Sequence, residues 1–152
     1  MVSVRAEAVV DAPPAVVYGL IADYRRGHPR IVPAEYFQDI VVERGGVGAG
    51  TVIHFQARFF GLARTLRAEV TEPSPGSVLV ETDPGTGVRT TFTVEARDEG
   101  RASHVSIDTE FPARGLRGRL EAMFARRLLP KVYALELENL ARVARETAAG
   151  AS

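Results

Sequence analysis

The sequence predicts an α+β domain in which a curved, seven-stranded antiparallel sheet surrounds one long C-terminal helix. Apolar and polar residues alternate with a period of two in seven segments, and the last six of these segments are joined by short connections. In the last third of the chain the apolar spacing changes to three and four residues. A sheet with one solvated face needs a cover on its other face, and only the terminal helix is long enough to provide it.

The chain opens on a predicted strand, 2–10, whose valines and alanines alternate with polar residues. Asp11-Ala-Pro-Pro follows this strand and predicts the start of a helix, with Asp11 as its N-terminal cap. We expect a second short helix or a turn within 23–31, before Pro33. Two short helices therefore separate the first strand from the rest of the sheet.

The middle of the chain reads as a series of hairpins. Each connection contains the Gly, Pro or Asp residues that tight turns require. The glycine-rich connection 45–50 superficially looks like a phosphate-binding loop, but a strand follows it where such a loop needs a helix. We therefore exclude nucleotide binding and interpret it as a hairpin turn that could border a ligand cavity. The six predicted strands are 36–44, 51–60, 62–72, 77–82, 87–97 and 102–111.

The terminal helix is expected over 116–144, about 45 Å long at 1.5 Å per residue. Pro130 lies inside it and removes one backbone donor, so a kink is expected near 125–131. We predict a single domain over 1–148 and a frayed tail over 149–152.

Composition excludes several classes of function. Lys+Arg and Asp+Glu both number 19, so no net charge favours nucleic acid. The chain has no cysteine and its three histidines are widely spaced, so we predict neither a metal site nor another cofactor. No apolar run approaches the ~18 residues that stable membrane insertion needs, and the first residues do not resemble a signal peptide. We therefore expect a cytoplasmic protein.

Four features together resemble the START-related superfamily, which includes the birch-pollen-allergen proteins and the bacterial polyketide cyclase/dehydrase-like proteins. They are the first strand with Asp11-Ala-Pro-Pro-Ala-Val-Val-Tyr18, the segment from Leu20 to Ile31, the glycine-rich turn before Thr51, and the long terminal helix. The resemblance implies a helix-grip fold with a cavity between sheet and helix. The chain differs from the family pattern in having no tryptophan, with His28 and Ile31 where bulky aromatics are common.

Alternation assigns most inward side chains without the resemblance. This lining suits a small apolar ligand oriented by few polar contacts, although a solid core would show the same alternation. The resemblance favours a cavity over a solid core. The predicted ligand-binding residues of the sheet are Phe55, Ala57, Phe59, Leu66, Thr90, Phe92 and Thr109, and those of the helix are Phe124, Leu128 and Tyr133.

Arg64 is the one charged residue that the alternation of the strands places inward. A buried arginine needs an anion, a carbonyl oxygen or the open rim, because an unpaired buried charge is very costly. Arg64 could therefore anchor a ligand carboxylate or polarise a ketone. Its position next to the turn at Gly61 also allows it to extend into solvent.

Three further polar residues could contact a ligand near the entrance. Tyr36 and Gln38 would share the inward face of their strand with Ile40 and Val42. His28 belongs to the segment that resembles the cavity mouth, and histidine is the natural general base near neutral pH. No carboxylate is placed by the sequence to orient His28, so a solvated turn is the alternative. His54 and His104 fall on the polar face.

These observations leave three functions open. The first is binding or carriage of a lipid, an isoprenoid or an aromatic polyketide, favoured because no acid–base pair can be placed from the sequence. The second is an enzyme of the polyketide cyclase/dehydrase type. The third is an interaction module, since the basic run of the terminal helix could bind an acidic protein and the chain could form a homodimer. This run comprises Arg114, Arg117, Arg119, Arg126, Arg127 and Lys131.

Overall fold

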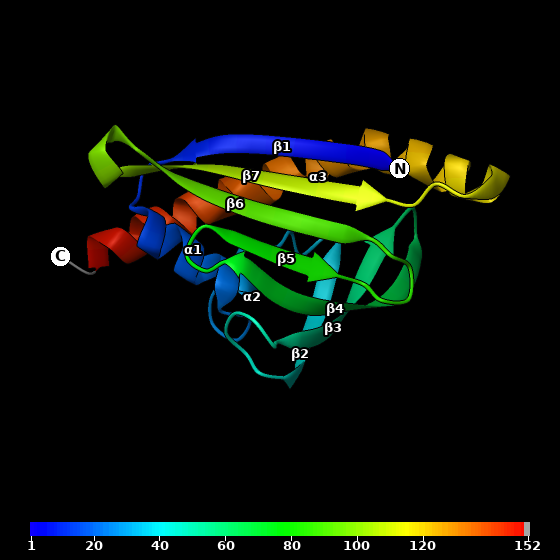
Figure 1. The fold of residues 1–152 in the computed structure, drawn as a ribbon, viewed down its shortest axis with the longest axis horizontal. Coiled ribbons are helices and arrows are strands. Elements are labelled where there is room, and N and C mark those ends of the chain that lie inside the picture. Colours follow the sequence, from blue (N-terminus) through cyan, green and yellow to red (C-terminus); the bar gives the residue numbers. More distant parts are fainter. Residues whose placement is uncertain (151–152) are drawn as a thin grey trace.

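A computed structural model describes residues 1–150, and its seven strands form one antiparallel sheet in the order β1-β7-β6-β5-β4-β3-β2 (Figure 1). The predicted fold class is confirmed, and every strand boundary lies within about two residues of its predicted place because the turn residues mark the connections clearly. The strands are β1 (Val2–Val10), β2 (Phe37–Arg44), β3 (Val52–Phe59), β4 (Leu62–Ser74), β5 (Val78–Thr82), β6 (Arg89–Arg97) and β7 (Ala102–Phe111).

Two short helices, α1 (Pro14–Ala22) and α2 (His28–Ile31), follow β1, and the long helix α3 (Gly115–Gly150) crosses the sheet (Figure 1). A single 3-10 turn, η1 (Asp98–Gly100), joins β6 to β7. The prediction that Asp11 caps α1 is wrong. Pro13 occupies the cap position with no side-chain hydrogen bond, because the fixed backbone angle of the next proline starts the helix there.

Helix α3 has Pro130 in its interior and ends two residues beyond 148, where the sequence predicts the domain to end. The predicted tail 149–152 is thus helical as far as Gly150, and residues 151 and 152 lie outside the described part of the chain. Among the described residues, no helix combines the length and the apolar character that crossing a bilayer demands.

The two halves of α3 have different surroundings. Its C-terminal half buries Leu137, Leu140 and Val143 in the core, and the helix packs against α1, α2 and β1. The N-terminal half continues past the end of β7 (Figure 1) and leaves Leu116 and Leu120 exposed. The apolar stripe predicted along the whole helix therefore enters the core over only part of its length.

The hairpin between β3 and β4 turns on two residues with positive φ, Phe60 at 53° and Gly61 at 76°. Phe59 pairs with Leu62 across this turn, which is the geometry of a type I′ hairpin. The turn leaves Phe60 and Leu62 largely exposed at the hairpin tip. The ring of Phe60 meets that of Phe124 on α3, with a distance of 5.6 Å between ring centroids. The hairpin tip and α3 thus face each other.

The glycine-rich loop between β2 and β3 packs against the end of α1. The carbonyl of Gly46 accepts a hydrogen bond from the Tyr24 amide at 2.8 Å, and the amide of Gly48 donates to Ala22 at 2.9 Å. Gly48 has a φ of 67°, and the carboxylate of Glu72 fills the space that a Cβ would need. The suggestion that this loop borders the cavity is wrong, since its residues bind α1 and do not line the cavity.

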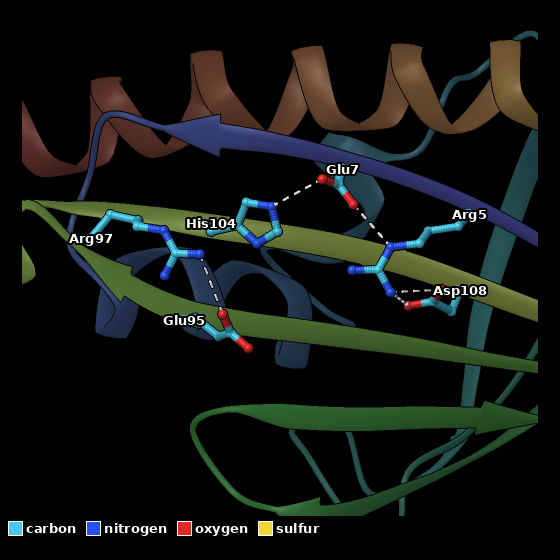
Figure 2. Close-up of polar contacts among 6 residues, drawn as sticks. All are labelled: Arg5, Glu7, Glu95, Arg97, His104 and Asp108. Carbon is cyan, nitrogen blue, oxygen red and sulfur yellow. Dashed lines mark hydrogen bonds and ion pairs between the residues drawn. The ribbon is translucent and has the colours of Figure 1, made fainter.

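The face of the sheet opposite the cavity carries a ladder of charged side chains on β1, β6 and β7 (Figure 2). The Arg5 guanidinium lies 2.9 Å from Glu7 and 3.2 Å from Asp108. The Nε2 atom of His104 lies 3.5 Å from the carboxylate of Glu7. This arrangement agrees with the predicted solvated face, and it places His104 away from the cavity.

Candidate functional site

The sheet and α3 enclose a cavity of about 510 Å³, a size suited to a small organic molecule. At one end its lining residues are exposed, among them Phe60, Leu62 and Phe124, so this end is the mouth. At the other end the lining residues are buried, among them His28 and Glu136. The cavity therefore runs from an open mouth, where exposed phenylalanine and leucine side chains lie with charged residues such as Arg64 and Glu121, to a closed inner end.

Most of the walls come from the residues that alternation places inward. Small side chains such as Ala57 and Ala68 leave room between the sheet and α3. That these residues bind a ligand stays a prediction. The predicted site residues that line the cavity are His28, Phe55, Ala57, Phe59, Arg64, Leu66, Thr90, Phe92, Thr109, Phe124, Leu128 and Tyr133.

Tyr36 and Gln38 are the predicted site residues that do not line the cavity. Asp39 adopts a φ of 55°, and the pairing of β2 with β3 shifts between Gln38 and Val41. Such a bulge changes which side chains of a strand point inward, so Phe37 and Ile40 line the cavity together. The Gln38 amide instead donates to the Ala34 carbonyl at 2.8 Å.

Arg64 lines the cavity near its mouth, where its side chain is exposed. Within residues 1–150, no ion pair to Arg64 is present. Contact with solvent removes the cost that a buried unpaired guanidinium would carry. Arg64 is thus free to meet the polar group of a ligand that enters from this side.

The inner end is polar, and His28 is at its centre. The imidazole is only 4% exposed, and its Nδ1 atom lies 2.7 Å from the carbonyl oxygen of Ile21. Its Nε2 atom lies 3.5 Å from Glu81 and 3.9 Å from Glu136. The alternative of a solvated turn is therefore wrong, and so is the expectation that His28 lies at the cavity mouth. Two glutamates distant in sequence meet this histidine in the fold.

Tyr24 holds two members of this cluster in place. Its hydroxyl donates a hydrogen bond of 2.5 Å to the carboxylate of Glu81, and its ring stacks on His28 with centroids 4.5 Å apart. Burial and the neighbouring Glu81 raise the pKa of Tyr24 well above its ordinary value, so the phenol keeps its proton. Tyr24 therefore acts as a permanent donor to Glu81.

Glu136 is the most isolated of these groups. It projects from α3 into the cavity lining and is only 3% exposed. Among the described residues, its one ion-pair contact is with the His28 Nε2 atom at 3.9 Å, which is too long for a hydrogen bond. Burial first, and then repulsion by Glu81, raise the pKa of Glu136 from 4.5 to about 8. The group is therefore a neutral carboxylic acid near pH 7.

A chain of hydroxyl groups lines the same end of the cavity. Tyr133 and Thr109 are 2.5 Å apart through their oxygen atoms, and Thr109 and Thr90 are 2.9 Å apart. Thr90 pairs with Glu81 between β6 and β5, which places the hydroxyl chain beside the carboxylate. The inner end thus offers both acids and hydroxyls to a ligand.

Sequence reasoning missed Glu81, Glu136 and Tyr24, and two of these left a signal. Glu136 interrupts the buried stripe of α3 between Val132 and Leu140, where an apolar residue is expected. Glu81 shares the inward face of β5 with Leu79. A carboxylate on an otherwise apolar face marks a buried polar site.

Within residues 1–150, no three or more His, Asp or Glu side chains are arranged to hold a metal ion.

Comparison with known proteins identifies relatives of this chain. The family model described as "Polyketide cyclase / dehydrase and lipid transport" matches residues 1–145. The solution structure of the KanY protein is 28% identical, with a TM-score of 0.80 over 95% of this chain and 97% of that one. A search of curated proteins found no match.

Two aromatase/cyclase structures share the fold. Zhui, from a Streptomyces species, is 19% identical, with a TM-score of 0.66 over 93% of this chain and 94% of that one. The two-domain protein BexL, from the BE-7585A biosynthetic pathway, is 17% identical, with a TM-score of 0.68 over 93% of this chain and 46% of that one. At these identities the likeness is one of fold.

Proposed function

Because the chain belongs to the family of polyketide cyclases/dehydrases and lipid transport proteins, we propose that it binds a small apolar molecule whose polar end group points inward. The observation that carries this proposal is the asymmetry of the cavity. Phenylalanine and aliphatic side chains form its walls, whereas His28, Glu81 and Glu136 gather at its closed end. A ligand buried in this orientation satisfies the polar groups and covers its own apolar surface.

Filling the cavity tests this proposal. Ala57 is buried in the cavity wall, so Ala57→Phe is expected to weaken binding of an apolar fluorescent probe at least about 10-fold by occupying the ligand's volume. Probe titration measures the affinity, and native mass spectrometry of freshly purified protein identifies any bound metabolite. Ala63→Phe on the exposed side of the neighbouring strand is the matched control. Equal affinities in the two variants would contradict a ligand in this cavity.

Arg64 supports a preference for ligands that carry an acidic or carbonyl group at the outer end in addition to the polar group at the inner end. For a carboxylic acid with a ketone at its other end as probe, Arg64→Ala is expected to lower the affinity about 5-fold by removing a charge-assisted hydrogen bond. The corresponding alcohol, with the same ketone, should bind both proteins equally well. Isothermal titration measures the two affinities. An equal loss for acid and alcohol would mean that Arg64 contributes only packing.

A second candidate function is catalysis of the cyclase/dehydrase type, and the polar cluster at the inner end favours it. A carboxylic acid and an imidazole lie 3.9 Å apart and both line the cavity, so one ligand could meet an acid and a base as general acid–base catalysis requires. Turnover that is lost in Arg64→Ala while the fold is retained would support an enzyme that also uses the arginine at the mouth. If the protein is a carrier, Arg64→Ala should change only its affinity for the ligand.

The basic half of α3 supports an acidic protein partner as a further proposal. A surface depression of about 450 Å³ on this part of the helix is lined by Arg119, Arg126 and Arg127. Among the described residues, Arg117 with Glu121 is the one ion pair in the basic run. Salt-sensitive co-purification with an acidic protein would test the partner. A homodimer and a cytoplasmic location stay predictions.

A further inference from the structure

Among the described residues, the one ion-pair contact of the Glu136 carboxyl group is with the His28 Nε2 atom, 3.9 Å away. Glu136 also lines the cavity, so its carboxyl oxygens are accessible to a molecule bound there. The position of Glu136 in the middle of the packed stripe of α3 would suit an apolar residue better. A role in acting on a bound ligand would explain why a carboxyl group occupies this position.

The hydrogen bonding of His28 determines where its reactive nitrogen points. A carbonyl oxygen can only accept, so the contact with Ile21 requires the hydrogen of the neutral imidazole to be on Nδ1. The lone pair of Nε2 then faces the cavity between Glu81 and Glu136. The Glu81 carboxylate, 3.5 Å from Nε2, is close to the position of a proton that Nε2 takes.

We propose that His28 and Glu136 act as the base and the acid of a site that enolises an apolar ketone held in the cavity, with Glu81 stabilising the protonated base. This inference rests on the proposed function, because the ketone must bind with its carbonyl group at the inner end. The distance of 3.9 Å between Nε2 and Glu136 is too long for a hydrogen bond, so both groups are available to one ligand that lies alongside them.

The proposed step balances in atoms and charge. Nε2 of His28 takes the proton from the carbon next to the carbonyl group, and the electron pair of that C–H bond forms the carbon–carbon double bond of the enol. The π electrons of the carbonyl group move to its oxygen, which takes the proton of Glu136. The products are a neutral enol, a His28 imidazolium beside Glu81, and a Glu136 carboxylate. Reversal of both transfers restores the starting state.

The outer face of the sheet contains the same residue types in an inert setting (Figure 2). His104 lies 3.5 Å from Glu7, the same distance as His28 from Glu81. There the Arg5 guanidinium lowers the pKa of Glu7, and neither Glu7 nor His104 lines the cavity between the sheet and α3. The His104–Glu7 pair is therefore an internal control for the residue types without the enclosed space.

The size of the cavity defines the probe. A bicyclic ketone such as 2-tetralone fits about 510 Å³, is largely apolar and carries acidic hydrogens next to its carbonyl group. In deuterium oxide near neutral pH, the full chain should accelerate exchange of these hydrogens about 100-fold or more over buffer, the range of general acid–base catalysis. Proton NMR follows the exchange, and saturation-transfer difference on the same samples measures binding.

Substitutions of His28 and Glu136 test whether these residues cause the acceleration of exchange. Glu136→Gln keeps the shape of the side chain but has no acidic proton, and it should lose about 10-fold or more of the acceleration while still binding 2-tetralone. His28→Gln should do the same, and Glu136→Gln carries the test if His28→Gln does not fold. Glu7→Gln and His104→Gln should exchange like the unmodified chain.

Binding without accelerated exchange, or acceleration that survives Glu136→Gln, would overturn this inference and leave the binding function standing. Failure of 2-tetralone and of its single-ring analogue acetophenone to bind would overturn both the proposed function and the inference. A loss of exchange in His104→Gln equal to that in His28→Gln would also overturn the assignment to the cavity.

Discussion

Replacing Glu136 with glutamine is expected to raise the free energy of unfolding at pH 8 by on the order of 4 kcal/mol, and to change it little at pH 5. The cause is the difference between the folded pKa of about 8 and the ordinary value of 4.5. Below pH 4.5 both states hold the proton. Between pH 4.5 and 8 the unfolded chain releases it while the folded chain keeps it, so stability falls as pH rises.

Urea unfolding at pH 5, 6.5 and 8 measures this effect. The groups that face Glu136 are His28 from α2, Glu81 from β5, and Tyr24 and Tyr133, so the profile reports the whole cluster. Glu7→Gln is the control. Arg5 lowers the pKa of Glu7, so that carboxylate contributes stability above its ordinary pKa and loses it as pH falls. A gain in Glu136→Gln that is the same at all three pH values would contradict titration as its cause.

Leu140→Ala should destabilise the fold by about 3 kcal/mol, whereas Leu120→Ala should cost less than about 1 kcal/mol. Both leucines belong to the apolar stripe predicted along the terminal helix. Leu140 is 1% exposed and packs in the core, so truncating it leaves a cavity. Leu120 is 46% exposed on the half of α3 that continues past the sheet, so its truncation removes few contacts.

Denaturant unfolding compares the two variants. If the slope of the unfolding free energy against denaturant concentration is unchanged, the shift of the midpoint measures the change in stability. Similar losses would mean that the N-terminal half of α3 packs as firmly as the C-terminal half. Binding of an apolar probe provides a second readout, because Leu120 does not line the cavity. Leu120→Ala should therefore keep the affinity of the unmodified chain.

The apolar walls of the cavity could be predicted because they depend on a local rule. Side chains alternate along a strand, so the positions of Phe55, Ala57 and Phe59 follow once the strand is recognised. The same rule failed for Tyr36 and Gln38. A single residue with positive φ, Asp39, shifts the register of β2, whereas the alternation rule assumes that every residue of the strand is extended.

By itself, the sequence determined the order and type of the elements, the seven strands and the long helix, because turn residues and apolar periodicity act over a few neighbouring positions. Only the tertiary structure decided that His28, Glu81 and Glu136 share one closed space. These residues come from α2, β5 and α3, and their meeting depends on how the helix crosses the sheet. No local pattern encodes that crossing, and the pKa of Glu136 depends on the burial that results from it.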